Sequence, residues 1–224
     1  MNSKQVKQLK ERIFWIDPAC IDFYAPKSSF PYIKEKNDNL QRYPRFIANF
    51  LNTRIEKNVP FVFDRHTFAT EVVPVQNVLR YKLVKNLLDQ KLQYHHSDWY
   101  ELLEKQLQLQ GYAKHKKIIM KNLDEVQGFF DGYVIPLYQS LINEGFKVES
   151  IYNVARVYIG PDGQMFKGES GFHRFAIARE TGIQIMPVRV AGIHQGWFEK
   201  RDVNKDDLEQ SLVDLFALYD KDLG

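Results

Sequence analysis

The residues best suited to chemistry form one loop in the last third of the chain, Gly168-Glu-Ser-Gly-Phe-His-Arg174. The loop runs into a predicted helix, and a helix N-terminus offers unpaired backbone N–H groups and partial positive charge to an anion. Gly168 and Gly171 permit a close approach of the backbone and unusual dihedral angles. Ser170 can donate from its hydroxyl, and Arg174 can bind two phosphate oxygens at once. The pattern predicts a phosphate-binding loop. The alternative is an ordinary turn, in which His173 caps the helix and Arg174 forms a surface salt bridge.

Two residues of this loop could take part in a reaction. Glu169 could hold Mg²⁺ against phosphate oxygens, because Mg²⁺ in such sites takes one or two carboxylates besides the phosphates. Its alternative is a solvated carboxylate. His173 could contact a phosphate, carry a proton near neutral pH, or fix the loop through a backbone carbonyl. Glu169 and His173 are therefore the candidate catalytic residues.

Three other places carry suggestive side chains. His194 and Trp197 follow a predicted strand and could flank a base or a substrate, although a Trp there is more often a lid on the core. Arg189 alternates with valines, and we expect it to face solvent unless it turns toward the loop and adds a phosphate contact. The basic run 114–117 could touch an anionic partner, but short lysine runs are usually solvated surface.

The elements that must position the loop have clear local signals. The segment 151–159 is rich in β-formers, Pro161-Asp-Gly163 predicts a hairpin turn, and 164–167 would be the returning strand. A helix is predicted from about Gly171 to Thr181, and Gly182 would end it. A third strand is predicted over 185–190, where Pro187 suits an edge or the start of a strand.

The remaining segments read mainly as helices. A last amphipathic helix is predicted over 206–218, and helices before the loop are predicted over 2–13, 45–56, 76–92, 98–111 and 123–143. The second of these would have Phe46, Phe50, Leu51 and Ile55 facing inward. Asp98 and Glu101 have capping-box spacing and would open the helix that Gly111 closes, and Gly128, Gly132 and Pro136 would bend the helix over 123–143. A short strand is expected at 118–120, and the segments 61–63 and 71–73 could be strands or buried loop. The segment 17–34 reads as a proline-punctuated loop.

The amino-acid composition limits the classes of protein to which the chain can belong. The 224 residues fit one large domain or two small ones, and an apolar fraction of 44% is enough for a real core. A net charge of +3 does not by itself imply nucleic acid. The single cysteine, Cys20, excludes an intramolecular disulfide and a Cys-rich metal site and suggests a reducing cytoplasm. The sequence shows neither a signal peptide nor an apolar run long enough to span a bilayer.

Several common catalytic and metal-binding patterns are missing from the sequence. Neither Asp64-Arg-His66 nor His95-His96 has the spacing of a chelating set, so no metal site made of protein ligands alone is expected. The chain has no P-loop and no Gly-x-Ser-x-Gly elbow, so the patterns of P-loop NTPases and serine hydrolases find no support.

The segment from about Leu137 to Trp197 resembles the ParB/sulfiredoxin superfamily. The resemblance rests on Leu141-Ile-Asn-Glu-Gly145 before a strand, the Asp162-Gly163 hairpin, the loop Gly171-Phe-His-Arg174, the small-residue helix after it and the final Ile-Met-Pro-Val188 strand. It implies a small mixed β-sheet with packed helices, and a loop that binds nucleotide phosphates. The implied phosphate-binding residues are Gly168, Ser170, Gly171, His173 and Arg174.

Departures from the family narrow the function. Phe172 stands where sulfiredoxin-like enzymes carry the reactive cysteine, which argues against sulfinate repair. Only 27 residues follow Trp197, too few for the helix-turn-helix domain of chromosome-partitioning members. Members that resemble a free-serine kinase phosphorylate a small hydroxyl substrate, and Glu144, Glu149, Asp162 or Glu169 could supply their acidic base.

The sequence therefore predicts an α+β protein. A mainly helical region, residues 1–115, would precede a ParB/sulfiredoxin-like domain, residues 116–224. The expected function is nucleotide binding, with a small-molecule kinase or NTPase reaction that uses Mg²⁺ with ATP or CTP. The alternative is a non-catalytic regulatory or DNA-associated module. No membrane partner is expected, and nucleic acid is a secondary possibility.

Overall fold

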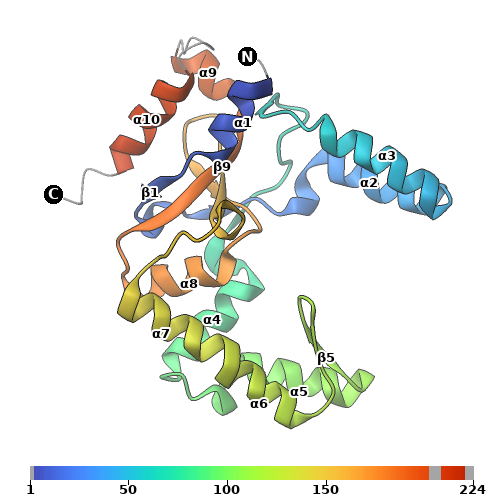
Figure 1. Cartoon of the computed structure of the whole chain (residues 1–224), viewed down its shortest axis with the longest axis vertical. Helices are drawn as coiled ribbons and strands as arrows, with labels where there is room; N and C mark the ends of the chain where they lie inside the picture. Colours follow the sequence, from blue (N-terminus) through green and yellow to red (C-terminus); the bar gives the residue numbers. More distant parts are fainter. Residues whose placement is uncertain (1–2, 202–207, 220–224) are drawn as a thin grey trace. The chain divides into compact units, whose positions relative to one another are not determined.

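The computed structural model describes residues 3–201 and 208–219 (Figure 1). The chain divides into two compact units, and each is assembled from separate stretches of sequence. Unit 1 takes residues up to 75, residues 148–171 and residues from 185 onward, whereas unit 2 takes residues 76–147 and 172–184. The expected boundary near residue 115 lies inside unit 2, so the units do not follow a single cut of the chain.

Unit 1 is built around a mixed β-sheet with strand order β1-β9-β7-β8-β2-β4, and β3 also pairs with β9. Its strands are β1 (Phe14–Ile16), β2 (Phe23–Tyr24), β3 (Val62–Phe63), β4 (Val73–Pro74), β7 (Ala155–Ile159), β8 (Met165–Lys167) and β9 (Met186–His194). β7 is antiparallel to β8 and parallel to β9. The expected mixed α/β chain with a mixed sheet is confirmed.

The α-helices in the described part of unit 1 are α1 (Ser3–Glu11), α2 (Pro31–Arg42), α3 (Arg45–Lys57), α9 (Gln195–Arg201) and α10 (Leu208–Tyr219). α10 packs on β1, where the rings of Phe216 and Phe14 stack with centroids 4.0 Å apart. Leu208, Leu212 and Leu215 are buried on the same helix, as its heptad-like pattern predicts. The expected start of this helix at residue 206 lies outside the described residues.

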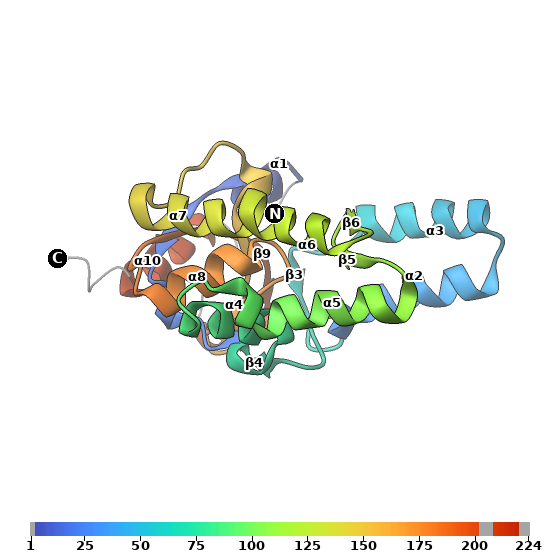
Figure 2. The same cartoon turned by 90° about the horizontal axis from the view of Figure 1, so that it is seen from below.

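Two other helices of unit 1, α2 and α3, lie side by side as a hairpin (Figure 2). Pro44 precedes α3 and suits a helix start because its φ is already fixed. Small and polar residues make the contact between the helices: Ala48 is fully buried, and the Nδ2 of Asn52 donates to the carbonyl of Lys36 at 3.1 Å. Leu51 and Ile55, which share this side of α3, are half-buried.

Unit 2 is helical apart from one small hairpin. It contains α4 (Leu79–Asp89), α5 (Asp98–Gln110), β5 (Ala113–His115), β6 (Ile118–Met120), α6 (Leu123–Phe129), α7 (Ile135–Glu144) and α8 (Phe172–Thr181). α8 packs on α4 and α7. A π-helical turn, Phe130–Val134, joins α6 to α7 where a bend near Gly132 was expected. Among the described residues, no helix is both long and apolar enough to cross a membrane.

Several local predictions needed correction. The segment 17–34 contains strand β2, and Pro31 opens α2 rather than extending a loop. The N-cap of α5 is Ser97 and not Asp98, because the Ser97 hydroxyl accepts from the Tyr100 N–H at 3.2 Å. β9 is flanked by β1 and β7, so of the two places open to Pro187 the strand start is correct.

The inward orientation of two phenylalanines on α3 was also wrong. Phe46 is 75% exposed and Phe50 is 71% exposed. Ala48 faces α2, and each phenylalanine is two residues away from it, which is about 200° around a helix. The side of α3 that packs on α2 is therefore the side opposite to these rings.

Candidate anion-binding site

The first half of the predicted loop, Gly168–Gly171, belongs to unit 1 and packs tightly along β7. The Gly168 N–H donates to the carbonyl of Arg156 at 2.8 Å. Gly171 has φ +70°, and a Cβ at that position would come within 3.1 Å of the Ala155 Cα. A side chain at Gly171 would therefore be strained by both its backbone conformation and its neighbour, as the pattern of the loop predicted.

A buried lysine stabilises this half of the loop through hydrogen bonds. The side chain of Lys167, the last residue of β8, is fully buried. Its Nζ donates to the Gly168 carbonyl at 2.7 Å and to the Ser170 carbonyl. A buried ammonium is costly unless it is hydrogen-bonded, so these carbonyls both stabilise the lysine and fix the loop. The Ser170 hydroxyl lies 3.4 Å from the carbonyl of Val154, at the limit of a hydrogen bond.

Glu169, half-buried between these residues, accepts a hydrogen bond from the hydroxyl of Tyr24. The bond ties the carboxylate to strand β2. Among the described residues, no group of three or more His, Cys, Asp or Glu side chains is placed to hold a metal ion. A cation at Glu169 would consequently need most of its ligands from a bound molecule.

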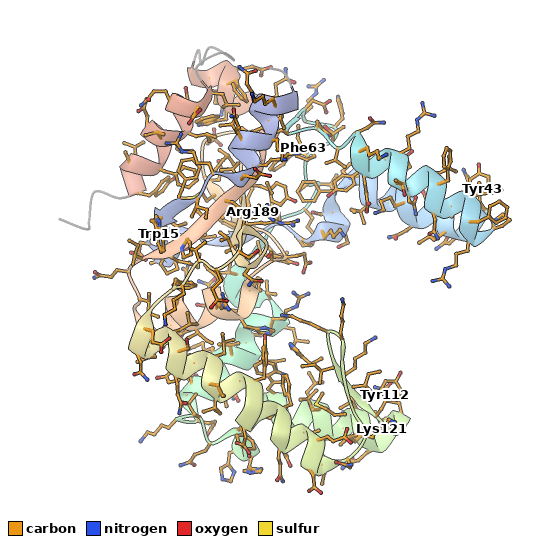
Figure 3. All side chains as sticks on the ribbon, viewed as in Figure 1. Trp15, Tyr43, Phe63, Tyr112, Lys121 and Arg189 are labelled. Atoms are coloured by element: carbon orange, nitrogen blue, oxygen red, sulfur yellow. The ribbon has the colours of Figure 1, made fainter. Side chains whose placement is uncertain are left out.

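Two arginines lie next to each other beside the loop. Arg156 on β7 is paired in register with Arg189 on β9. A Cβ placed on Gly168 would lie 3.5 Å from the Cβ of Arg156, so the Arg156 side chain leaves β7 next to the loop. Arg156 is exposed, whereas Arg189 is only 8% exposed, so the expectation that Arg189 faces solvent was wrong (Figure 3).

The positive charge of Arg156 affects the pKa values of neighbouring side chains. The pKa of Lys10 on α1 is lowered, first by burial and then by the positive charge of Arg156. Burial raises the pKa of Tyr158, whose hydroxyl interacts with that of Tyr32, and Arg156 partly opposes that rise. Positive charge therefore gathers beside the glycine loop on unit 1, together with two tyrosine hydroxyls.

The second half of the loop belongs to unit 2 and forms the first turn of α8. His173 is only 6% exposed, and its ring stacks on Trp99 with centroids 5.1 Å apart. His115 packs against it at 5.0 Å. Burial lowers the pKa of His173 to about 3 and that of His115 to about 4, and Lys116 and Arg80 contribute in the same direction. Both imidazoles are neutral at pH 7.

Arg174 differs from its neighbour His173. It is only partly buried, and its guanidinium makes no hydrogen bond or salt bridge with any of the residues that the structure describes. Its position in the first turn of a ten-residue helix puts a guanidinium at the positive end of the helix dipole. The expected alternative of a surface salt bridge therefore gains no support from the described residues.

His194 and Trp197 are not brought to the loop. His194 ends β9 beyond Ile193, which pairs with Ile159, whereas the loop begins beside Arg156 at the other end of β7. The Nδ1 of His194 accepts from the Gly196 N–H at 2.9 Å. Trp197 is fully buried, and its ring lies against Gly163. These contacts explain both side chains by packing.

Sequence reasoning missed Arg156 and Lys167. A signal for Arg156 was present, because Ala155-Arg-Val157 and Val188-Arg-Val190 share one alternation. Parallel strands in register place matching positions side by side on one face. Lys167 gave no signal, since a lysine at the end of a hairpin strand is ordinarily solvated.

Comparisons of the chain with protein-family models, with curated proteins and with solved structures found no match. The function is consequently argued from the geometry of the loop and of the residues around it.

Proposed function

We propose that this chain is a nucleotide-binding protein that holds nucleotide phosphates at the loop 168–174. The observation that supports this most is the in-register pair Arg156 and Arg189 on the strands beside a glycine loop. Adjacent cations repel each other, and a polyanion would relieve that repulsion. Within unit 2, Arg174 and the first N–H groups of α8 are donors suited to phosphate oxygens.

The order of elements supports a ParB/sulfiredoxin-like arrangement as part of the same proposal. The β7–β8 hairpin, the glycine loop, α8 and β9, parallel to β7, follow one another as that resemblance implies. In this proposal Gly168 and Gly171 give the loop its shape. Lys167 fixes its carbonyls, and the arginines neutralise phosphate charge.

A phosphotransferase or NTPase reaction would use Mg²⁺ with ATP or CTP. The Glu169 carboxylate would bind the cation, which would otherwise be coordinated by phosphate oxygens and water. The cation would neutralise charge on the transferred phosphoryl group, and the protein would supply position and positive charge. The hydrogen bond from Tyr24 would orient Glu169 toward that task.

One observation favours the second candidate, a nucleotide-binding module without turnover. His173, the candidate proton carrier, is stacked inside unit 2 with a pKa lowered to about 3. A general acid or base works best with a pKa near the working pH and must reach the reacting atoms. We therefore assign His173 a positioning role, in which its packing anchors the first turn of α8.

Calorimetric titration with ATP and with CTP, each with Mg²⁺, tests the proposal. We expect one of the nucleotides to bind, and Arg174→Ala to weaken that binding by more than about tenfold, because charge-assisted bidentate contacts are strong. Arg156→Gln should weaken it as well. Arg179→Ala removes the same charge from the last turn of α8 and should leave the affinity unchanged.

The results distinguish the candidates clearly. Absence of heat with both nucleotides would overturn the proposal, as would equal losses in Arg174→Ala and Arg179→Ala. If a nucleotide binds, release of phosphate from it over hours separates an enzyme from a binding module. Glu169→Gln should abolish release with little effect on binding if Glu169 holds the catalytic cation.

A further inference from the structure

The far end of the α2–α3 hairpin exposes an unusual set of side chains. Tyr43 is 44% exposed, and it lies at the tip where Figure 3 labels it. Phe46 and Phe50 follow at helical spacing and are more than two-thirds exposed. Leu40 and Ile47 are exposed as well. Phe46 and Phe50 are four residues apart and lie on one side of α3, and Tyr43 lies in the turn that precedes this helix. We call Leu40, Tyr43, Phe46, Ile47 and Phe50 the hairpin tip.

The hairpin holds its shape without these rings. Asn52 is buried between the helices, where its Oδ1 accepts from Asn39 at 3.1 Å and its Nδ2 bonds the Lys36 carbonyl. Lys36 also forms a salt bridge with Glu56 across the hairpin. The rings of Phe46 and Phe50 therefore lie away from the contact between α2 and α3 and remain available to a partner.

The charge of the hairpin tip has one sign. No acidic residue occurs between Asn39 and Ile55, whereas Arg42, Arg45 and Arg54 all fall in that stretch. All of its cations are arginines, although lysine is the commoner cation of the whole chain. Arginine differs from lysine in binding phosphate through two parallel hydrogen bonds and in stacking its plane on aromatic rings. A partner of this surface should be anionic and should offer phosphates.

We propose that the hairpin tip binds single-stranded nucleic acid. Exposed rings on which bases can stack, next to cations that bind the backbone, are the two components of sequence-tolerant single-strand binding. Tyr43, Phe46 and Phe50 would accept bases, and Arg42 and Arg45 would bind phosphates. A duplex offers its phosphates but keeps its bases stacked, so it uses only half of this surface. A second copy of the chain that met this surface with its own hairpin tip would bring the same positive charges and would be repelled.

The proposal is independent of the nucleotide site, which involves no residue of the hairpin tip. Binding is measured by fluorescence anisotropy of labelled 20-nucleotide dT and U oligomers with the full chain. We expect binding that weakens with salt, and a loss of about tenfold or more for Phe46→Ala/Phe50→Ala, because stacking on each ring contributes substantially. Arg42→Gln/Arg45→Gln should reduce the salt slope by about 1.4, since each phosphate contact on a single strand contributes about 0.7.

Matched controls separate the hairpin tip from charge or apolarity in general. Leu109→Ala removes another strongly exposed apolar side chain, and Lys114→Gln/Lys117→Gln removes two cations from the β5–β6 turn. Both should bind the oligomers as the wild type does. Absence of oligomer binding overturns the proposal, as does equal weakening by these controls. It is overturned too if the chain prefers vesicles of anionic phospholipid or a 20-base-pair duplex to the single strand.

Discussion

Two helical regions of this chain carry aromatic side chains at helical spacing, and one region buries these rings whereas the other exposes them to solvent. In unit 2, Trp99, Phe129 and Phe130 pack together with centroids 5.4–5.8 Å apart. In the α2–α3 hairpin, Phe46 and Phe50 face solvent, and Ala48 lies between the helices. Periodicity alone identifies a stripe on a helix but not the side that is buried. The neighbours decide it: large aromatic rings of α5 and α6 pack against each other, whereas Ala48 and the hydrogen-bonded Asn39 and Asn52 are among the residues between α2 and α3.

The largest expected effect tests the inward-facing rings. Phe130 is fully buried and stacks on Tyr94 with centroids 4.8 Å apart. Phe130→Ala should lower the free energy of unfolding by about 3–5 kcal/mol, because it removes apolar contacts and leaves a cavity. Urea unfolding followed by circular dichroism measures it. Phe46→Ala makes the same change on the exposed face and should stay within about 0.5 kcal/mol, and similar losses in the two variants would remove the contrast.

A second prediction uses pH to examine the aromatic core of unit 2. The folded pKa of His173 is lowered to about 3 from an ordinary value near 6.5, so the unfolded chain takes up the proton first. The contribution of neutral His173 to the free energy of unfolding is therefore complete above about pH 6.5 and is lost as the pH falls toward 3. Between pH 7 and pH 5, His173 alone should account for a loss of about 2 kcal/mol.

His173→Phe isolates this contribution. The variant should lose about 2 kcal/mol less than the wild type between pH 7 and pH 5, whatever its stability at pH 7. His115, with a pKa lowered to about 4, should supply the decline that remains. The Nε2 of His115 is buried and has no hydrogen-bond partner in the described part of the chain. An unchanged pH dependence in His173→Phe would mean that His173 titrates normally and is not buried as described.

The smallest expected effect concerns the start of α5. Ser97→Ala removes the cap on the Tyr100 N–H and the bond from the Ser97 hydroxyl to the Tyr94 carbonyl at 2.7 Å. We expect a loss of about 1 kcal/mol, measured as a shift in the urea midpoint. Asp98→Ala, one residue along, should cost about 0.5 kcal/mol or less. The reverse order would restore Asp98 as the N-cap.

Local signals predicted most of the fold that surrounds the loop. The Pro161-Asp-Gly163 turn, the helix ended by Gly182 and the strand after it are all present, because each depends on residues a few positions apart. The strands β1 and β2 were missed because they are two or three residues long and are defined by pairing with β9 and β8. The interleaved units could not be predicted either, because α8 joins unit 2 through contacts with α4 and α7.

For the candidate site, the sequence predicted residue types better than their surroundings. The glycine requirement at Gly171 was predicted and is confirmed by its positive φ. The stacking of His173 on Trp99 joins residues 74 positions apart, and no local pattern indicates it. The pairing of Arg156 with Arg189 depends on the register of β7 against β9, which only the folded sheet defines. The role of the loop as a phosphate site stays a prediction.

Because Lys167 is buried, covalent labelling of its amine can measure how often the loop opens. An amine-acylating reagent modifies lysines that water reaches, and Lys167 has no exposed side-chain surface. Modification there requires the loop to lift off its ammonium group, which breaks the bonds to the Gly168 and Ser170 carbonyls. The rate at which Lys167 is acylated, set against that of an exposed lysine such as Lys147, therefore reports how often the loop opens. A ligand bound to the loop would lower the rate at which Lys167 is acylated.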